Sequence, residues 1–227
     1  MIDILLIEDD PDIADNLQEY LTNASEGKWR IHISDNGDDG LELATQTIYS
    51  LILLDIGLPG RDGFGICRSL RRRGIQTPVI FVTARYTEED ILKGYECGGD
   101  DYIVKPFSMA QLSAKIKAFL KRYCETDNSS VSYLDLTADA KERKLYAGGA
   151  EISLLPREFD ILLYLMQHPD RLISREELLA RVWGADSEAI PRNLDNPIKN
   201  IRKAIASSEA IIVTQRGYGY RLEAGNV

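Results

Sequence analysis

Short apolar runs alternate with segments of helical spacing through the first half of the chain. The runs are Ile2–Ile7, Trp29–Ser34, Leu51–Leu54, Pro78–Val82 and Tyr102–Val104. After the first run, apolar residues recur three or four positions apart, at Ile13, Leu17, Tyr20 and Leu21. Such alternation of buried strands and amphipathic helices is typical of α/β units with a parallel sheet. The pattern therefore predicts a doubly wound, five-stranded parallel α/β domain over residues 1–123.

The pattern changes in the second half. Residues 124–132 are polar and aperiodic, which predicts a linker. The segments that follow are typical of three short strands, three helices and a closing hairpin: Tyr133–Leu136, Lys144–Ala147, Glu151–Leu154, Pro156–Gln167, Ser174–Trp183, Arg192–Ala206 and Ile211–Tyr220. A tight turn is expected at Gly148-Gly149. Residues 133–227 are therefore expected to form an α+β domain.

Composition narrows the class of protein. The chain has 227 residues, of which 44% are apolar and 28% charged, as expected for a folded protein. Its aliphatic runs are far shorter than the ~20 residues that cross a bilayer, and its start lacks a basic leader. The three cysteines are not in C-x-x-C pairs, which favours reduced thiols and a cytoplasmic location. A net charge of −9 argues against a general affinity for nucleic acid but leaves room for a local basic patch.

Polar side chains stand at the ends of four predicted strands. Glu8 and Asp9 follow the first strand, Asp55 the third, Thr83 ends the fourth, and Lys105 follows the fifth. Parallel strands of such a sheet end at one edge, where ligands bind, so these side chains should converge. Clustered carboxylates need a cation, and oxygen ligands suit Mg²⁺. A lysine and a threonine opposite them can hold a transferring phosphoryl group, with an aspartate as its acceptor.

The segments that carry these residues resemble the receiver domain of two-component response regulators. They are Glu8-Asp9, Leu54–Gly63, Thr83-Ala84 and Lys105-Pro106-Phe107. The resemblance implies a flavodoxin-like fold that accepts a phosphoryl group from a histidine kinase. Because the segments match in order over some 100 residues, the separate interpretations of each residue, as a helix cap or a solvated charge, are disfavoured.

The resemblance also implies a role for each position. Asp55 would be the phosphoacceptor, and the metal ligands would be Glu8, Asp9, Asp55 and the backbone carbonyl of Gly57. Thr83 and Lys105 would contact the phosphoryl group. Tyr102 would be an aromatic switch that turns inward with Thr83, and the Lys105–Pro106 peptide would be cis.

The resemblance implies that phosphorylation acts on the face made by the fourth helix, fifth strand and fifth helix. In this chain that face is rich in both signs of charge, and a self-complementary patch suits a two-fold dimer. The candidate residues are Lys93, Asp100, Asp101, Lys115, Lys117 and Arg122. The alternative is an ordinary solvated surface, because exposed ion pairs contribute little to stability.

The second half resembles the winged-helix output domain of the OmpR/PhoB family. The resemblance rests on Glu158-Phe159, Ser174–Leu179, Val182-Trp183-Gly184 and Arg216–Arg221. It implies a third helix in the major groove of promoter DNA and a hairpin wing at the minor groove. The expected DNA contacts are Arg192, Lys199, Asn200, Arg202, Lys203, Thr214 and Arg216. A solvated basic face is the alternative, because residues 124–227 carry 13 basic and 16 acidic groups.

Two residues of the third helix depart from the family pattern. Pro197 stands where relatives usually carry histidine, and proline inside a helix removes a hydrogen bond at a cost of ~3 kcal/mol. The helix could bend there or start late, with Asn196 as its N-cap; the unbroken apolar spacing favours the bend. Asn200 replaces a frequent arginine. Because asparagine pairs with adenine, a target richer in A·T is one hypothesis, and contact with phosphate or water alone is the other.

These patterns together predict a phosphorylation-controlled transcription factor. It would not be a dedicated enzyme, although slow hydrolysis of its own phosphoryl group is expected. RNA polymerase is a further candidate partner, and no membrane partner is expected. A haloacid-dehalogenase-like phosphatase is disfavoured because that chemistry needs a second acid at position 57, which is glycine. The other alternative is an output domain that binds a protein, or binds DNA only weakly, as Pro197 and the acidic balance suggest.

Overall fold

The chain divides into two compact units, Met1–Lys121 and Arg122–Val227. The computed structural model describes residues 1–124, 130–184 and 189–225, apart from the side chains of residues 122–124. Most of the predicted linker and the side chain of Arg122 therefore lie outside the described residues. Among the helices described, none is long and apolar enough to cross a membrane.

The first unit is the predicted α/β domain. Its strands are β1 (Ile2–Ile7), β2 (Trp29–Ser34), β3 (Leu51–Leu54), β4 (Val79–Thr83) and β5 (Asp101–Val104). All neighbours pair in parallel, in the order β2-β1-β3-β4-β5. The sequence therefore predicted this sheet correctly. Residues Leu51–Leu54 are fully buried, as expected for a central strand covered on both faces.

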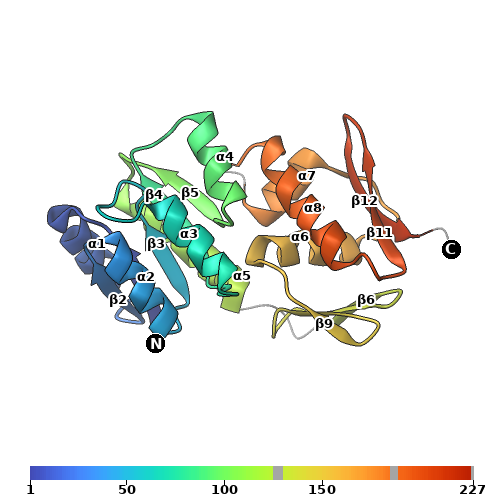
Figure 1. Ribbon diagram of the computed structural model, residues 1–227, viewed down its shortest axis with the longest axis horizontal. Helices are drawn as coiled ribbons and strands as arrows, with labels where there is room; N and C mark the ends of the chain where they lie inside the picture. Colours follow the sequence, from blue (N-terminus) through green and yellow to red (C-terminus); the bar gives the residue numbers. More distant parts are fainter. Residues whose placement is uncertain (125–129, 185–188, 226–227) are drawn as a thin grey trace. The chain divides into compact units, whose positions relative to one another are not determined.

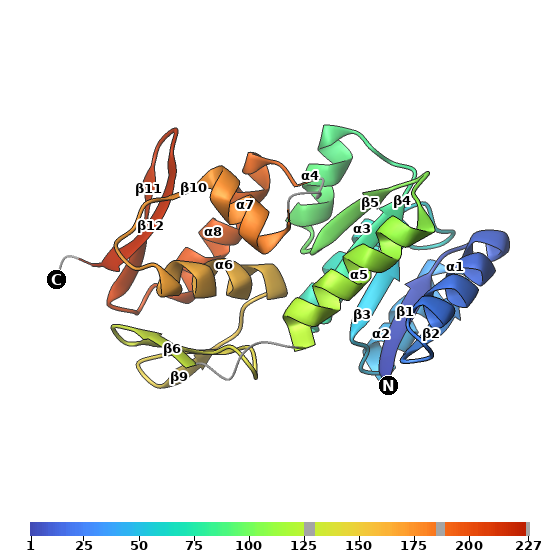
Figure 2. The same ribbon diagram turned by 180° about the vertical axis from the view of Figure 1, so that it is seen from behind.

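Five helices cover the sheet. They are α1 (Pro11–Ala24), α2 (Gly37–Gln46), α3 (Gly63–Arg72), α4 (Glu88–Glu96) and α5 (Met109–Cys124). Figure 1 shows α2 and α3 in front of the sheet, and Figure 2, seen from behind, shows α1 and α5 over the opposite face. Short polar residues start these helices: Asp10, Asp62 and Thr87 accept hydrogen bonds from the first turns of α1, α3 and α4.

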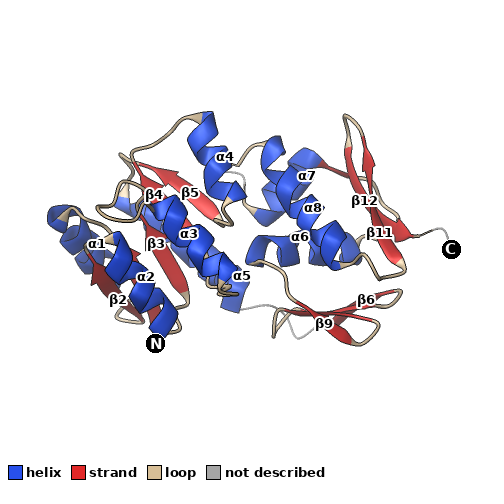
Figure 3. Cartoon of the chain, viewed as in Figure 1, coloured by secondary structure: helices blue, strands red, loops and turns tan. Residues whose placement is uncertain are grey.

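Over its described residues, the second unit has three α-helices and two antiparallel sheets, whose elements Figure 3 colours by type. The four-stranded sheet comprises β6 (Ser130–Tyr133), β7 (Leu136–Asp139), β8 (Lys144–Ala147) and β9 (Ala150–Ile152). The other sheet comprises β10 (Ile173–Ser174), β11 (Ala210–Gln215) and β12 (Gly219–Ala224). The helices are α6 (Pro156–Gln167), α7 (Arg175–Val182) and α8 (Asp195–Ala204). This order is that of the predicted winged-helix domain.

One predicted strand was misplaced. The run Tyr133–Leu136 spans a turn between β6 and β7, where Leu134 has a positive φ of 53°. An apolar residue rarely adopts this conformation, so a turn at this position could not be expected from residue type. The turn at Gly148-Gly149 is confirmed, because both glycines have positive φ and join β8 to β9.

The third helix starts late instead of bending. A 3-10 turn, η1 (Pro191–Leu194), leads into α8, which places Pro197 at the third helical position. The first four N–H groups of a helix have no partner inside it, so proline loses no hydrogen bond there. The favoured prediction of a bent helix was therefore wrong. The helix nevertheless begins before the position that the late-start alternative predicted, because its N-cap is Leu194 and not Asn196.

Candidate functional site

The ends of the parallel strands bring the predicted acidic cluster together. The Asp55 amide donates to the Ile7 carbonyl at 3.0 Å, and the Lys105 amide donates to the Thr83 carbonyl at 2.8 Å. These backbone bonds continue the strand pairing one residue beyond the strands. They place the side chains that follow β1, β3 and β5 at one edge of the sheet, as predicted.

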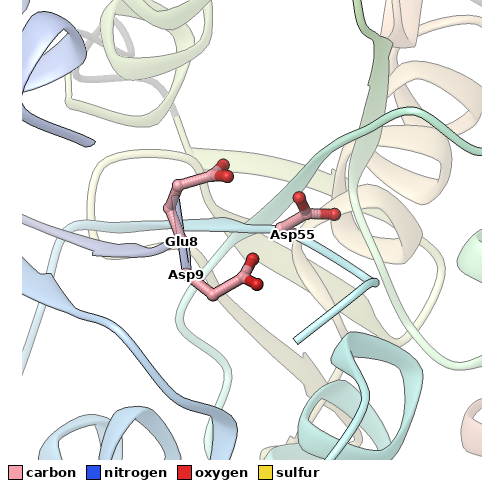
Figure 4. Close-up of side chains that lie close together, drawn as sticks. All are labelled: Glu8, Asp9 and Asp55. Atoms are coloured by element: carbon pink, nitrogen blue, oxygen red, sulfur yellow. The ribbon is translucent and has the colours of Figure 1, made fainter. Parts of the chain in front are cut away.

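Three carboxylates meet at this edge. One oxygen each of Glu8, Asp9 and Asp55 lies within 4.8 Å of the others, and Figure 4 shows the three side chains turned toward one another. Glu8 and Asp55 are buried, while Asp9 is exposed to solvent. Lys105 Nζ lies 2.6 Å from Glu8 Oε2 and 2.7 Å from Asp55 Oδ2. Lys105 thus pairs with two of the three carboxylates, which leaves the cluster with an excess of negative charge.

The environment shifts the pKa of each buried member. Burial raises the pKa of Glu8, and the opposing effect of Lys105 does not cancel it. Burial also acts to raise the pKa of Asp55, but hydrogen bonds from Lys105 and the Gly57 amide, together with the Lys105 charge, outweigh it and lower the pKa. Burial acts to lower the pKa of Lys105, but its bonds to Asp55 and Glu8 raise it. Asp55 and Lys105 are therefore both charged at neutral pH.

The two oxygens of Asp55 differ in their surroundings. Oδ1 accepts the backbone N–H groups of Ile56 at 2.5 Å and Gly57 at 3.1 Å. Oδ2 accepts from Lys105, and the hydroxyl of the buried Thr83 also hydrogen-bonds to Asp55. The backbone thus fixes one oxygen, while the other faces the ammonium.

Tyr102 lies inside the domain. Its ring is fully buried, and its hydroxyl donates to the Arg85 carbonyl at 2.9 Å. Arg85 follows Thr83 by two residues, and its amide donates to Thr83 Oγ1 at 3.4 Å. The loop after β4 therefore connects Tyr102 to the threonine beside the acidic cluster. The Lys105–Pro106 peptide is cis, as the resemblance implied.

The donor set of this edge fits a hard divalent cation. Carboxylate oxygens are the ligands that Mg²⁺ prefers, and the exposed Asp9 leaves a side open to water or substrate oxygens. The cluster's excess of negative charge favours a cation as well. The residues present therefore suit the metal that the sequence predicted.

The charged face of α4, β5 and α5 differs from the prediction. Asp100 is 1% exposed, and its Oδ2 accepts the Val79 amide at 2.9 Å and Arg71 Nη2 at 3.1 Å. Its assignment to a dimer face was therefore wrong, because a buried carboxylate cannot meet a second copy. Asp101 is also buried, 3.5 Å from Lys115 Nζ of the same chain. Lys93 and Lys117 are exposed.

Arg71 is a structural residue that the sequence analysis missed. Besides Asp100, its guanidinium donates to the carbonyls of Ile75, Thr77 and Gly98 at 2.8–3.0 Å. Helical spacing could have found it, because Arg71 follows the buried Phe64 by seven residues on α3 and so shares its face.

The predicted DNA contacts gather on η1, α8 and the β11–β12 hairpin. Arg192, Lys199, Lys203 and Arg216 are exposed. Arg202 bridges helix and hairpin, since its Nη2 donates to the Ile212 carbonyl and to Thr214 Oγ1, both at 2.7 Å. The structure thus places the seven predicted residues on η1, the third helix and the wing.

Asn200 has a partner within the domain that the sequence analysis did not foresee. Its Nδ2 donates to Oε1 of the buried Glu158 at 2.8 Å, and Glu158 Oε2 accepts the Leu155 amide at the start of α6. The side chain of Asn200 thus ties α8 to α6.

Each of the two units matches a family of known proteins. Residues 4–117 match the family described as response regulator receiver domain, and residues 149–222 match transcriptional regulatory protein, C terminal. The chain is 39% identical to the uncharacterized transcriptional regulatory protein YkoG of Bacillus subtilis, over 97% of both chains. It is 35% identical to the transcriptional regulatory protein ResD of the same organism, over 98% of this chain and 96% of ResD.

Solved structures give the same result over the full length. The response regulator DrrB of Thermotoga maritima, an OmpR/PhoB homologue, is 33% identical with a TM-score of 0.52, covering 99% of this chain and 100% of DrrB. A cysteine-to-serine mutant of RitR is 26% identical with a TM-score of 0.72, at the same coverage. The fold and the acidic edge are those of a response regulator with a DNA-binding output domain. The chain belongs to the OmpR/PhoB family, whose members regulate transcription and are not dedicated enzymes.

Proposed function

We propose that Asp55 accepts a phosphoryl group from a histidine kinase, and that this modification promotes dimerisation and sequence-specific DNA binding. The observation that carries the proposal is the setting of Asp55, whose Oδ2 lies 2.7 Å from Lys105 Nζ among three carboxylates. The protein would act in the cytoplasm, where kinase, promoter DNA and RNA polymerase are all accessible.

Asp55 and the side chains around it have different roles in the proposed phosphoryl transfer. Oδ1 is held by the amides of Ile56 and Gly57, so Oδ2 is the oxygen that attacks phosphorus. The new P–O bond forms as the P–N bond of the phosphohistidine breaks. Lys105 and Thr83 then bind phosphoryl oxygens and stabilise the charge that develops on them. Slow attack by water on the same phosphorus would reverse the modification.

Glu8, Asp9 and Asp55, with the Gly57 carbonyl, are the proposed ligands of Mg²⁺. When bound, the metal would neutralise charge on the phosphoryl oxygens. Because position 57 is glycine, the site has no second acid two residues after Asp55. This distinguishes the site from that of a phosphatase with an aspartate nucleophile.

Replacement of one metal ligand should show the metal requirement. We expect Asp9→Asn to weaken Mg²⁺ binding by roughly tenfold or more, because even changes outside the ligand shell cost about 10–100-fold. Isothermal titration of the variant with Mg²⁺ measures the loss. Asp15→Asn, which removes an exposed carboxylate from α1, is the matched control and should bind Mg²⁺ like the unmodified chain. Equal affinities for both variants would contradict the proposed ligand set.

The output domain is proposed to place α8 in the major groove and the β11–β12 wing at the minor groove. Lys199 and Lys203 are exposed one turn apart on α8, and Arg216 is exposed at the wing turn. Arg202 and Thr214 connect the two elements, so they would set their relative position as well as meet phosphates. To pair with adenine, the Asn200 side chain would have to break its hydrogen bond to Glu158. If that bond is kept, Asn200 contacts no base.

Lys199 should act through its charge alone. We expect Lys199→Ala to weaken binding to every DNA sequence alike and to reduce the salt dependence, the slope of log K against log salt, by about 1. Fluorescence anisotropy over a salt series measures this slope. Lys141→Ala, in the β7–β8 turn, supplies a control that removes an exposed lysine outside α8 and the wing. An unchanged slope for Lys199→Ala would remove this residue from the interface.

Dimerisation is proposed through the α4–β5–α5 face, with a smaller set of residues than the sequence suggested. Lys93 and Lys117 are the exposed members of that set within the described residues, whereas Asp101 and Lys115 already pair inside one chain. The acidic first turn of α4, which begins with Glu88 and Glu89, offers the opposite charge.

A further inference from the structure

A seam of side chains joins α3 to the C-terminal end of α4. Lys93 Nζ lies 4.8 Å from the centre of the Phe64 ring at one end of the seam. Arg71 Nε and Nη2 donate to the Gly98 carbonyl at 3.0 and 2.8 Å at the other end. Cys67 and Cys97 lie between them, where Cys67 Sγ donates to the Cys97 carbonyl at 3.3 Å.

The two cysteines of the seam lie close together. Cys67 and Cys97 are free cysteines 30 residues apart in the sequence, and the Cys67 thiol donates to the backbone carbonyl of Cys97 at 3.3 Å. Cys97 Sγ is also 3.0 Å from the Gly94 carbonyl. Because Phe64, Cys67 and Arg71 share one face of α3, the contacts at both ends of the seam keep the thiols together.

The two cysteines have different surroundings. Cys67 is fully buried, and the neighbouring Cys97 thiol and burial both raise the pKa of its thiol. Cys97 is 6% exposed; the neighbouring Cys67 thiol, the Gly99 amide and the charges of Arg68 and Arg71 lower the pKa of its thiol despite burial. Since the thiolate is the nucleophile, Cys97 is the member of the pair suited to attack, and Cys67 is suited to resolve.

We propose that Cys67 and Cys97 form a redox-active dithiol that hydrogen peroxide oxidises to an intramolecular disulfide. The Cys97 thiolate attacks one peroxide oxygen, the O–O bond breaks, and the departing hydroxide takes up a proton to become water. Cys67 sulfur then attacks the sulfenic acid on Cys97: an S–S bond forms, the S–O bond breaks, and the hydroxyl leaves with the Cys67 proton as water. The two thiols lose two electrons and two protons, and peroxide is reduced to two waters.

The disulfide would restrain the helix beside the proposed switch. A Cβ on Gly94 of α4 would lie 3.1 Å from the Tyr102 ring, so α4 packs directly on this residue. A covalent bond between α3 and the residue that ends α4 would hold α4 in its present position. If phosphorylation of Asp55 moves α4, the oxidised protein will dimerise less readily; this second step rests on the proposed function, whereas the oxidation does not.

Peptide mapping tests the oxidation directly. The full chain is treated with a small excess of hydrogen peroxide, its remaining thiols are alkylated, and trypsin releases residues 62–68, 94–115 and 123–141, each with one cysteine. We expect a product in which 62–68 is joined to 94–115, lighter than their sum by two hydrogen atoms and lost on reduction. The Cys124→Ser variant should give the same product, and Cys67→Ser and Cys97→Ser should not. Alkylated, unlinked 62–68 and 94–115 peptides after treatment, or links to 123–141 instead, would overturn the proposal.

Sedimentation of the same samples with Mg²⁺ and beryllofluoride tests the second step. The oxidised chain should stay mainly monomeric at a concentration where the reduced chain dimerises, and a reductant should restore the dimer. If the disulfide forms but dimerisation is unchanged, the proposed restraint on α4 is refuted, whereas the proposed oxidation of the two thiols is not. The Cys67→Ser variant, which cannot close the disulfide, should dimerise equally before and after peroxide.

Discussion

Asp55→Asn should abolish phosphorylation of the chain while leaving its fold intact. Asparagine matches aspartate in shape, but its amide is not a nucleophile, so no acyl phosphate can form. Incubation with Mg²⁺ and a small phosphoryl donor such as acetyl phosphate should load about one phosphoryl group on each unmodified chain and none on the variant. Intact-mass spectrometry measures the difference.

Asp35→Asn is the matched control for this experiment. Asp35 follows β2 at the same edge of the sheet, but it is exposed and is not among the three clustered carboxylates. This variant should be phosphorylated to the same extent as the unmodified chain. Phosphorylation of Asp55→Asn, or its loss in Asp35→Asn, would mean that the phosphoacceptor has been assigned to the wrong residue.

Arg71→Met should destabilise the receiver unit by about 3–5 kcal/mol. Removal of one partner from a buried ion pair leaves the other charge uncompensated, and Asp100 has a side chain only 2% exposed. The substitution also removes the donors to three backbone carbonyls between α3 and β5. Urea unfolding followed by the fluorescence of Trp29, with Trp183 replaced by phenylalanine, reports the free energy of this unit.

The neighbouring arginine gives the control. Arg72 is exposed on the same helix, and Arg72→Met should change the free energy of unfolding by less than about 0.5 kcal/mol. Similar free energies for the two variants would show that the buried pair between Arg71 and Asp100 contributes nothing to stability.

The sequence predicted the sheet and the acidic cluster because local patterns determine both. A central parallel strand such as Leu51–Leu54 is apolar on both faces, and residues that follow parallel strands must meet at one edge. These relations hold without any knowledge of the packing between helices.

The features that were misplaced depend on contacts between distant residues. Asp100 looked like a surface charge because nothing near it in sequence reveals that Arg71, 29 residues earlier, compensates it inside the domain. Pro197 was ambiguous because apolar spacing continues through a 3-10 turn into an α-helix without a break. The contact between Asn200 and Glu158 was not foreseen for the same reason, because this hydrogen bond joins two helices of the output domain that are far apart in the sequence.

The proposed function requires a phosphoryl group on Asp55 to control DNA binding by the output domain. Its most direct test is fluorescence anisotropy of the full chain on its own promoter DNA, with and without Mg²⁺ and beryllofluoride, over a salt series. We predict tighter binding with beryllofluoride, weakening steeply as salt rises because phosphate contacts release counterions. Dimerisation with beryllofluoride but no DNA binding in either state would contradict this control of DNA binding, and would point to a protein partner for the output domain.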